Sequence, residues 1–187
     1  MYSFASLLSI TRERELFEKI SAAKKLFVTI FSEVGNRVGS VDLTEIHAGQ
    51  KGIKISKGNE LQHCPYQVLD IIRDFDPESG LNIRVLHWWG RGLFLQLYLG
   101  RIHPFLRTSQ VEKLTQYEFN LCKADRWNYQ QIIDQDKMEP FEVQYLPEHL
   151  LHYSHLQLIK TLPITEPDQV IQDVSLEIKR LYSLLRK

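Results

Sequence analysis

The pattern of hydrophobic and polar positions is most informative over residues 82–101, where two apolar-rich runs flank a short Gly-Arg-Gly connection. Two strand-like runs around a glycine-containing turn are typical of a β-hairpin. If the connection is a three-residue loop, Trp89 lies opposite Leu93 and His87 lies opposite Leu95. The pattern therefore predicts a central hairpin whose side chains alternate between two faces.

The two faces of this predicted hairpin differ in composition. The first face is apolar apart from one histidine and comprises Ile83, Val85, His87, Trp89, Leu93, Leu95, Leu97 and Leu99. The second face is aromatic and polar and comprises Arg84, Leu86, Trp88, Phe94, Gln96 and Tyr98. We expect a helix to cover the first face. The second face is either covered by a further element, as large aromatic residues usually are, or open to water as a binding surface.

Amphipathic helices are predicted near both ends of the chain. In residues 11–34 the apolar positions recur at alternating steps of four and three, at Leu16, Ile20, Ala23, Phe27, Ile30 and Val34. A capping sequence at residues 165–168 precedes a similar stripe at Ile171, Val174, Ile178, Leu181 and Leu185. Such heptad-like seams pack on a sheet, on each other or across a homodimer axis. We expect packing on the sheet of the same chain, with a homodimer through these terminal helices as the alternative.

Weaker patterns indicate the elements in between. They predict a strand at residues 51–57, helices at 65–74, 109–121, 125–135 and 147–160, and a strand at 141–145. The segment 65–74 has a strand as its alternative, because it is rich in β-branched residues. Together the elements predict an α+β fold in a single domain of residues 1–187. Its small, mainly antiparallel sheet is built around the hairpin 82–101 and is covered by the N- and C-terminal helices.

Composition and charge narrow the classes of function. The chain has 187 residues, of which 43% are hydrophobic and 25% charged, as in ordinary globular domains. Its 23 basic and 23 acidic residues cancel, so nucleic acid is not an expected partner. Two cysteines are too few for a secreted disulfide scaffold. No apolar run reaches the ~20 residues that span a bilayer, and the first residues lack the basic start of a signal peptide. We therefore expect a cytoplasmic protein that does not bind a membrane.

The hairpin is also the most concentrated group of candidate binding residues. A buried imidazole must find hydrogen-bond partners or lose its charge. His87 is therefore either a core histidine bonded within the fold or one of the few polar groups that line an apolar ligand pocket. In the second case, we predict that the ligand-binding residues are His87, Trp88, Trp89, Arg91, Arg101 and His103.

Three further histidines, His149, His152 and His155, recur at steps of three. Residues three apart on a helix can share a metal, but two such steps rotate the outer pair away from each other. We therefore expect a solvated polar face here, with no metal and no cofactor. Cys64, next to His63, is not an expected nucleophile, because adjacent side chains rarely point at each other.

Three short segments carry a resemblance to known sequences. They are Ile-Ser-Lys-Gly at residues 55–58, Pro-Tyr-Gln-Val-Leu-Asp at 65–70 and Trp-Trp-Gly at 88–90. They resemble a pattern found in uncharacterised conserved bacterial proteins. The resemblance implies a bacterial, cytosolic protein of unassigned role, and it assigns no catalytic residue.

The function expected from the sequence is non-enzymatic binding of a small molecule or a protein partner through the aromatic and basic hairpin. The alternative is a hydrolase or transferase. Such an enzyme would use either His87 or a metal site at His149, His152 and His155.

Overall fold

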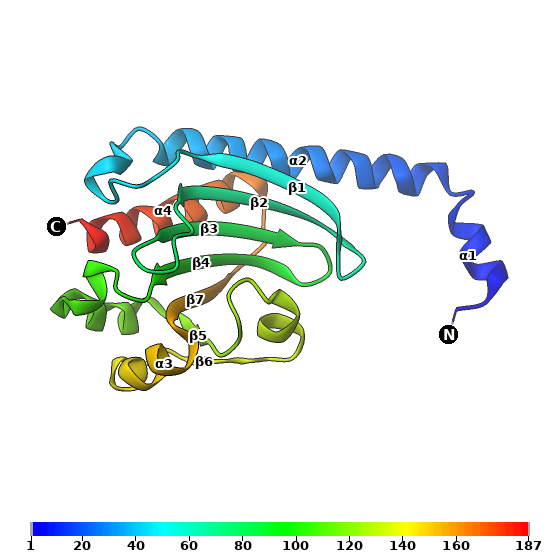
Figure 1. The fold of residues 1–187 in the computed structure, drawn as a ribbon. Helices are drawn as coiled ribbons and strands as arrows, with labels where there is room; N and C mark the ends of the chain where they lie inside the picture. Colours follow the sequence, from blue (N-terminus) through cyan, green and yellow to red (C-terminus); the bar gives the residue numbers. More distant parts are fainter. Residues whose placement is uncertain (1, 187) are drawn as a thin grey trace.

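The computed structural model describes residues 2–186 and places an antiparallel sheet at the centre of the molecule (Figure 1). Within this part of the chain seven strands form the sheet in the order β1-β2-β3-β4-β7-β5-β6, and each neighbouring pair is antiparallel. The strands are β1 (Lys54–Leu61), β2 (Cys64–Arg73), β3 (Leu81–Trp88), β4 (Gly92–Gly100), β5 (Asn120–Cys122), β6 (Met138–Pro140) and β7 (His155–Leu162). The α-helices are α1 (Phe4–Ile10), α2 (Arg14–Val38), α3 (Leu146–Tyr153) and α4 (Pro167–Leu185). The predicted α+β class with helices at both ends is confirmed.

The central hairpin consists of β3 and β4, joined by a loop at residues 89–91. Gly90 takes a φ of 75°, the left-handed conformation that a tight hairpin loop needs. His87 pairs with Leu93 and not with Leu95, so the strands lie two residues away from the predicted register. A shift by an even number of residues leaves every strand residue on its predicted face. Trp89 is the exception, because it lies in the loop and not in β3.

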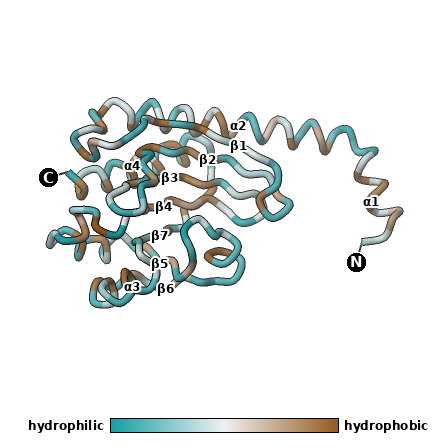
Figure 2. The backbone as a smooth tube through the Cα atoms, viewed as in Figure 1, coloured by the Kyte–Doolittle hydropathy of each residue, from teal (hydrophilic) through white to brown (hydrophobic). Residues whose placement is uncertain are grey.

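Helices α2 and α4 cover the first face of the sheet and pack against each other (Figure 1). Hydrophobic residues are concentrated along β3 and β4 and alternate with hydrophilic residues along α2 (Figure 2). The α4 seam is buried within the chain over its whole length, whereas burial of the α2 seam begins only at Phe27. None of the helices in residues 2–186 has the length and apolar character that crossing a membrane requires.

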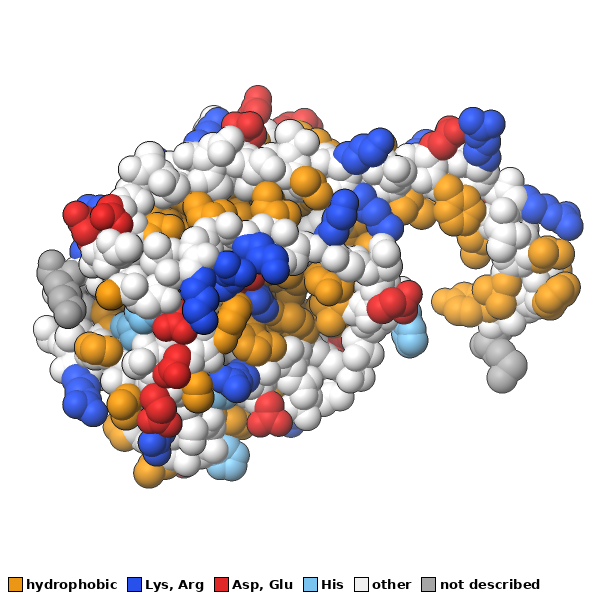
Figure 3. Space-filling view, turned by 45° about the horizontal axis from the view of Figure 1, so that its top comes forward, with side chains coloured by type: hydrophobic (Ala, Val, Ile, Leu, Met, Phe, Trp, Pro, Cys, Tyr) orange, Lys and Arg blue, Asp and Glu red, His pale blue; other side chains and the backbone are white. Residues whose placement is uncertain are grey.

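The N-terminal part of the chain extends away from the sheet (Figure 1). Helix α1 has no buried residue, and the first turns of α2 continue in the same projecting segment. Hydrophobic side chains show on the surface of this segment in the space-filling view (Figure 3).

The second face of the sheet is covered by residues 123–137, a largely irregular segment that follows β5. Its buried residues Ala124, Tyr129 and Ile132 pack on a cluster from the sheet that includes Val68, Leu86, Trp88, Phe94 and Ile159. Trp88 is 0% exposed and Tyr98 is 1% exposed. The sequence left open whether the aromatic face is covered or exposed to water, and the structure shows that it is covered.

A charged pair lies inside this covered face. Arg84 donates from Nε and Nη2 to the two carboxylate oxygens of Asp70, at 2.7 and 3.2 Å. Its Nη1 donates to the hydroxyl of Tyr129 at 2.8 Å, and its guanidinium lies 4.4 Å from the ring centroid of Trp127. Asn82 donates to Asp70 at 3.1 Å. These bonds replace the water that both charges lose, and they join β2, β3 and the covering segment.

The helix predicted at residues 65–74 is wrong, and the alternative is correct: the segment is strand β2. Its apolar residues fit helical spacing because a strand that is buried on both faces carries a nearly continuous apolar run. A bulge between Asp70 and Ile72 adds to the irregular spacing.

Other predicted elements also differ from the structure. Residues 109–121 form a 3-10 helix (Ser109–Tyr117) followed by β5, 125–135 form a loop with a π-helical turn (Gln130–Asp134), and 141–145 form a 3-10 turn (Val143–Tyr145). The helix predicted at 147–160 ends at Tyr153, where Ser154 takes a φ of 56° and directs the chain into β7. The strand predicted at 51–57 is present as β1 but begins at Lys54. In these segments apolar residues reach the core from irregular backbone, so their spacing does not report a regular period.

We expect Arg84→Met to lower the free energy of unfolding by about 3–5 kcal/mol, because it leaves the Asp70 carboxylate buried without its partner. The matched control is Arg14→Met, which breaks the exposed pair with Glu18 and should change the free energy of unfolding by less than about 1 kcal/mol. Urea denaturation followed by tryptophan fluorescence measures both. Equal losses in the two variants would contradict the role given to Arg84.

Candidate functional site

The six residues predicted to bind a ligand do not lie together. Three of them are buried, namely His87, Trp88 and His103. Arg91 lies in the hairpin loop, whereas Arg101 follows the far end of β4. A strand of this length separates its two ends by roughly 30 Å. The structure therefore does not bring the six side chains to one surface.

Both arginines of this set are bonded within the fold. Arg91 donates to both carboxylate oxygens of Asp134 at 2.9 and 3.1 Å, and its guanidinium lies 4.9 Å from the ring centroid of Trp88. Arg101 donates to Glu78 at 2.9 Å. These contacts tie the loops at the two ends of the hairpin to neighbouring segments.

His87 has the contacts of a core histidine. Its ring stacks on Phe27 of α2 with 3.5 Å between the ring centroids. Its Nδ1 lies 2.9 Å from the side-chain oxygen of Gln67, which also accepts a hydrogen bond from Trp89 at 3.0 Å. Because Trp89 can only donate, that oxygen is an acceptor and Nδ1 carries the proton. Burial lowers the pKa of His87 to about 4, so the ring is neutral at pH 7.

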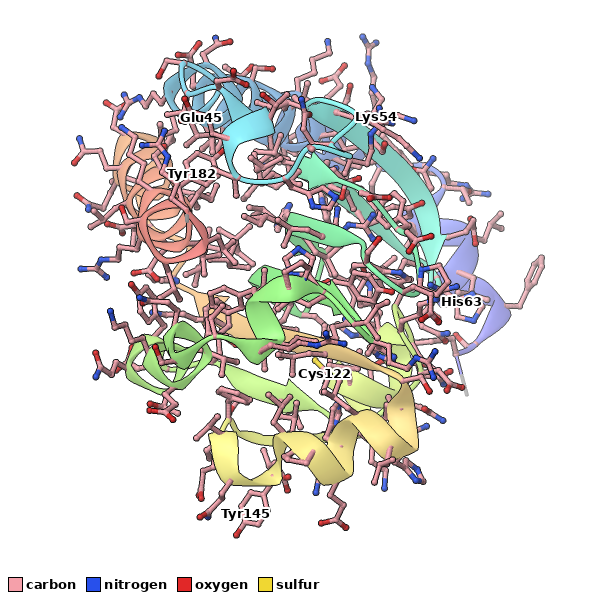
Figure 4. All side chains as sticks on the ribbon, turned by 60° about the vertical axis from the view of Figure 1, so that its left-hand side comes forward. Glu45, Lys54, His63, Cys122, Tyr145 and Tyr182 are labelled. Carbon is pink, nitrogen blue, oxygen red and sulfur yellow. The ribbon has the colours of Figure 1, made fainter. Side chains whose placement is uncertain are left out.

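A cavity of about 800 Å³ lies at the edge of the sheet, between β5, β6 and α3. Lys123, just after β5, and Glu139, in β6, contribute to one part of its lining, while Glu148, His149 and His152 contribute from α3. Figure 4 shows this edge, with Cys122 in β5 and Tyr145 beside the first residue of α3. Tyrosines also line the cavity at each end of the helix, so polar and aromatic groups meet in one hollow.

His149 is the most deeply buried polar residue of the cavity lining, with 5% of its surface exposed. Burial lowers the pKa of His149 to about 4, and the charge of the nearby His155 ring lowers it further. The backbone of His155, which the His149 ring approaches, acts in the opposite direction and raises the pKa. The His149 ring lies 4.7 Å from that of Tyr153, but neither ring nitrogen has a partner in hydrogen-bonding geometry within residues 2–186. A buried neutral imidazole with both nitrogens unpaired is costly unless a further molecule bonds to it.

The charges around His149 are mostly negative. Glu139, Glu142 and Glu148 line the cavity, and the only ammonium among the described lining residues is that of Lys123. Lys123 and Glu139 form an ion pair at 2.6 Å, and this bond raises the pKa of Lys123. Glu142 and Glu148 remain as the carboxylates in excess, and they give the cavity a negative potential.

The three histidines at steps of three form neither a metal site nor the expected solvated polar face, because His149 and His155 are buried. His149 and His152 line the cavity, but His155 lies on β7, where its Nδ1 bonds to the carbonyl of Tyr153 at 2.7 Å. The chain turns at Ser154, so His155 does not continue the helix. Within residues 2–186 no group of three or more His, Cys, Asp or Glu side chains is arranged to hold a metal ion.

Two features of the fold are not evident from the sequence. Lys123 and Glu139 belong to no motif and come together because β5 pairs with β6. His47 bonds through Nε2 to the carboxylate of Asp74 at 2.8 Å, with the ring of His103 at 5.7 Å. The His47–Asp74 contact links the turn after α2 to the end of β2, and 27 residues separate its members in the sequence.

Comparison of the chain with protein-family models, with curated proteins and with solved structures gave no match. The geometry and charge of the cavity are therefore the basis on which a function is proposed.

We expect the protein to lose stability as the pH falls from 6.5 to 4. His87 and His149 each have a folded-state pKa of about 4, below the ordinary histidine pKa of 6.5, so the unfolded chain takes up protons first. The stabilisation is complete above pH 6.5 and is lost as the pH falls through the folded-state pKa. In His87→Gln, the difference in unfolding free energy between the two ends of this range should shrink by about 1–3 kcal/mol. Urea denaturation at several pH values measures this, and an unchanged difference would contradict a buried neutral His87.

Proposed function

We propose that the protein binds a small organic cation, such as a protonated amine or guanidine, in the cavity between β5, β6 and α3. One observation carries the proposal: His149 is buried, neutral and unpaired in a cavity where carboxylates outnumber ammonium groups. An ammonium or guanidinium group supplies the hydrogen-bond donor that the unpaired imidazole nitrogen lacks. It also supplies the positive charge that Glu142 and Glu148 attract.

The aromatic lining fits the same ligand class. Tyr145 and Tyr153 line the cavity at either end of α3. The face of a tyrosine ring attracts a cation, and its apolar surface covers the hydrocarbon part of the ligand. A cavity of about 800 Å³ is within the range of ordinary small-molecule sites.

Binding accounts for these groups better than catalysis does. A pKa of about 4 makes His149 a weak base at pH 7, and a general base works best when its pKa is near the working pH. Lys123 is kept protonated by its bond to Glu139, whereas a nucleophilic lysine needs a lowered pKa. The proposal keeps the binding class expected from the sequence and moves the site from the hairpin to the sheet edge. A cytoplasmic location and a bacterial origin stay predictions from the sequence.

We expect agmatine and phenethylamine to bind with saturation in isothermal titration calorimetry, and glutarate, a dianion of similar size, not to bind. Glu148→Gln should weaken the binding of the cations by about tenfold or more, because it removes a charge beside the ligand. The matched control is Glu112→Gln on the exposed 3-10 helix, which should leave binding unchanged.

A second variant separates a ligand site from a structural histidine. His149→Phe removes the two unpaired nitrogens, so it should leave the stability of the free protein unchanged or raise it, and it should abolish binding of the cations. A large loss of stability in this variant would show that His149 is bonded within the fold. Failure of both amines to bind, or equal effects of Glu148→Gln and Glu112→Gln, would overturn the proposal.

A further inference from the structure

The N-terminal arm, defined as residues 2–26, projects from the body of the molecule (Figures 1 and 3) and contacts it through Lys24, which donates to the side chain of Asn59 in β1 at 2.7 Å. Large hydrophobic side chains are exposed along it, at Tyr2, Phe4, Leu7, Leu8, Ile10, Phe17 and Leu26. Phe4 is 81% exposed. Monomeric proteins rarely leave contiguous apolar patches of more than a few hundred Å² in water, so this arm has the composition of an interface.

The surface area of the chain is large for its mass. A compact monomer of 22.0 kDa is expected to expose about 9,300 Å², whereas this chain exposes 10573 Å². The excess of roughly 1,300 Å² exceeds the ~800 Å² that each partner buries in an ordinary protein interface. Burial of the arm against one partner of similar size would therefore bring the chain back to a normal exposed area.

The pattern of α2 shows what kind of surface the arm offers. Its seam keeps the alternating four- and three-residue spacing of a coiled coil throughout, but the body of the molecule covers only the part from Phe27 onward. Leu16, Ile20 and Ala23 continue the same seam and are only partly buried. A heptad seam is complete when a second helix packs its own seam against it. The small side chain of Ala23 allows that helix to approach closely.

The distribution of charge along the arm indicates which helix packs on the exposed α2 seam. Residues 12–18 carry three carboxylates and two guanidiniums, whereas residues 19–26 carry three ammoniums and no carboxylate. Two copies of the arm placed antiparallel set the acidic half of each against the basic half of the other, and such pairing is closed by a two-fold axis. A helix that lies on anionic lipid carries basic residues on its polar face, whereas three of the eight charged residues in this segment are carboxylates, which favours a second arm over a membrane as the partner.

We propose that the arm is a homodimerisation element that packs antiparallel against the arm of a second copy of this chain. The seam of α4 takes no part, because the chain's own core buries it. The observations that support the dimer concern the arm and not the cavity, so a failure of ligand binding would not bear on it.

Sedimentation equilibrium of the full chain at micromolar concentrations tests the proposal. The expected mass is twice 22.0 kDa. Leu16→Asp should give a folded monomer, since an aspartate in the first turn of α2 suits the helix dipole while placing a charge in the seam. The matched control is Leu176→Asp, at a residue 50% exposed on α4, which should remain a dimer. A monomeric wild-type chain, or a dimer that Leu16→Asp leaves intact, would overturn the proposal.

A charge exchange tests the antiparallel arrangement. One variant replaces Lys19, Lys24 and Lys25 with glutamate, and the other replaces Glu13, Glu15 and Glu18 with lysine. Each variant alone should be monomeric, because like charges then face each other, and an equal mixture should form a heterodimer. The antiparallel pairing would be ruled out if both variants were monomeric and formed no heterodimer on mixing. It would also be ruled out if either variant alone remained a dimer. Co-sedimentation of the wild-type chain with phosphatidylserine vesicles, lost in Leu16→Asp, would assign the arm to a membrane surface and also overturn the proposal.

Discussion

The covered second face of the sheet depends on the buried ion pair between Asp70 and Arg84. Strands β2, β3 and β4 are covered on both sides, so the charges of Asp70 and Arg84 must find their partners inside the protein. Arg84 does this with Asp70 on the neighbouring strand and with Tyr129 and Trp127 in the covering segment. That set of contacts explains why residues 123–137 have a defined place although they contain little regular secondary structure. It also closes the aromatic face, whereas the cavity lies at the β5–β6 edge of the sheet.

The sequence predicts those parts of the fold that local periodicity controls. Alternation over residues 82–101 assigns the strand residues to the correct faces, because side chains alternate in any register. The register itself depends on where the loop begins, and that is set by Gly90 and Gly92, which both take a positive φ. The segment 65–74 is ambiguous because burial on both faces removes the alternation that distinguishes a strand from a helix. The irregular cover at 123–137 is beyond such reasoning, since long-range contacts hold it in place.

The candidate site is predictable only in part. His149 and His152 stand out in the sequence by their spacing, and both line the cavity. The burial that leaves His149 neutral and unpaired depends on how α3 packs on β7, which no local pattern reports. His87 is also conspicuous in the sequence, as a polar residue on an apolar face, and so is Trp88, as a large aromatic residue in a strand. In the structure both residues make their contacts within the core. A residue that departs from the pattern of its segment is therefore a candidate for a functional role, but the sequence does not show whether it lines a cavity or packs in the core.

Amide hydrogen exchange by mass spectrometry reports whether the second face of the sheet stays closed in the native protein. If residues 123–137 cover β3 and β4 as a fixed part of the fold, the amides of both strands should exchange only through global unfolding. Their protection should then match the free energy of unfolding measured in urea. Exchange of β3 and β4 through a local opening, at a free energy far below that of unfolding, would mean that residues 123–137 open without the rest of the fold. It would show instead that the aromatic face is accessible to a ligand.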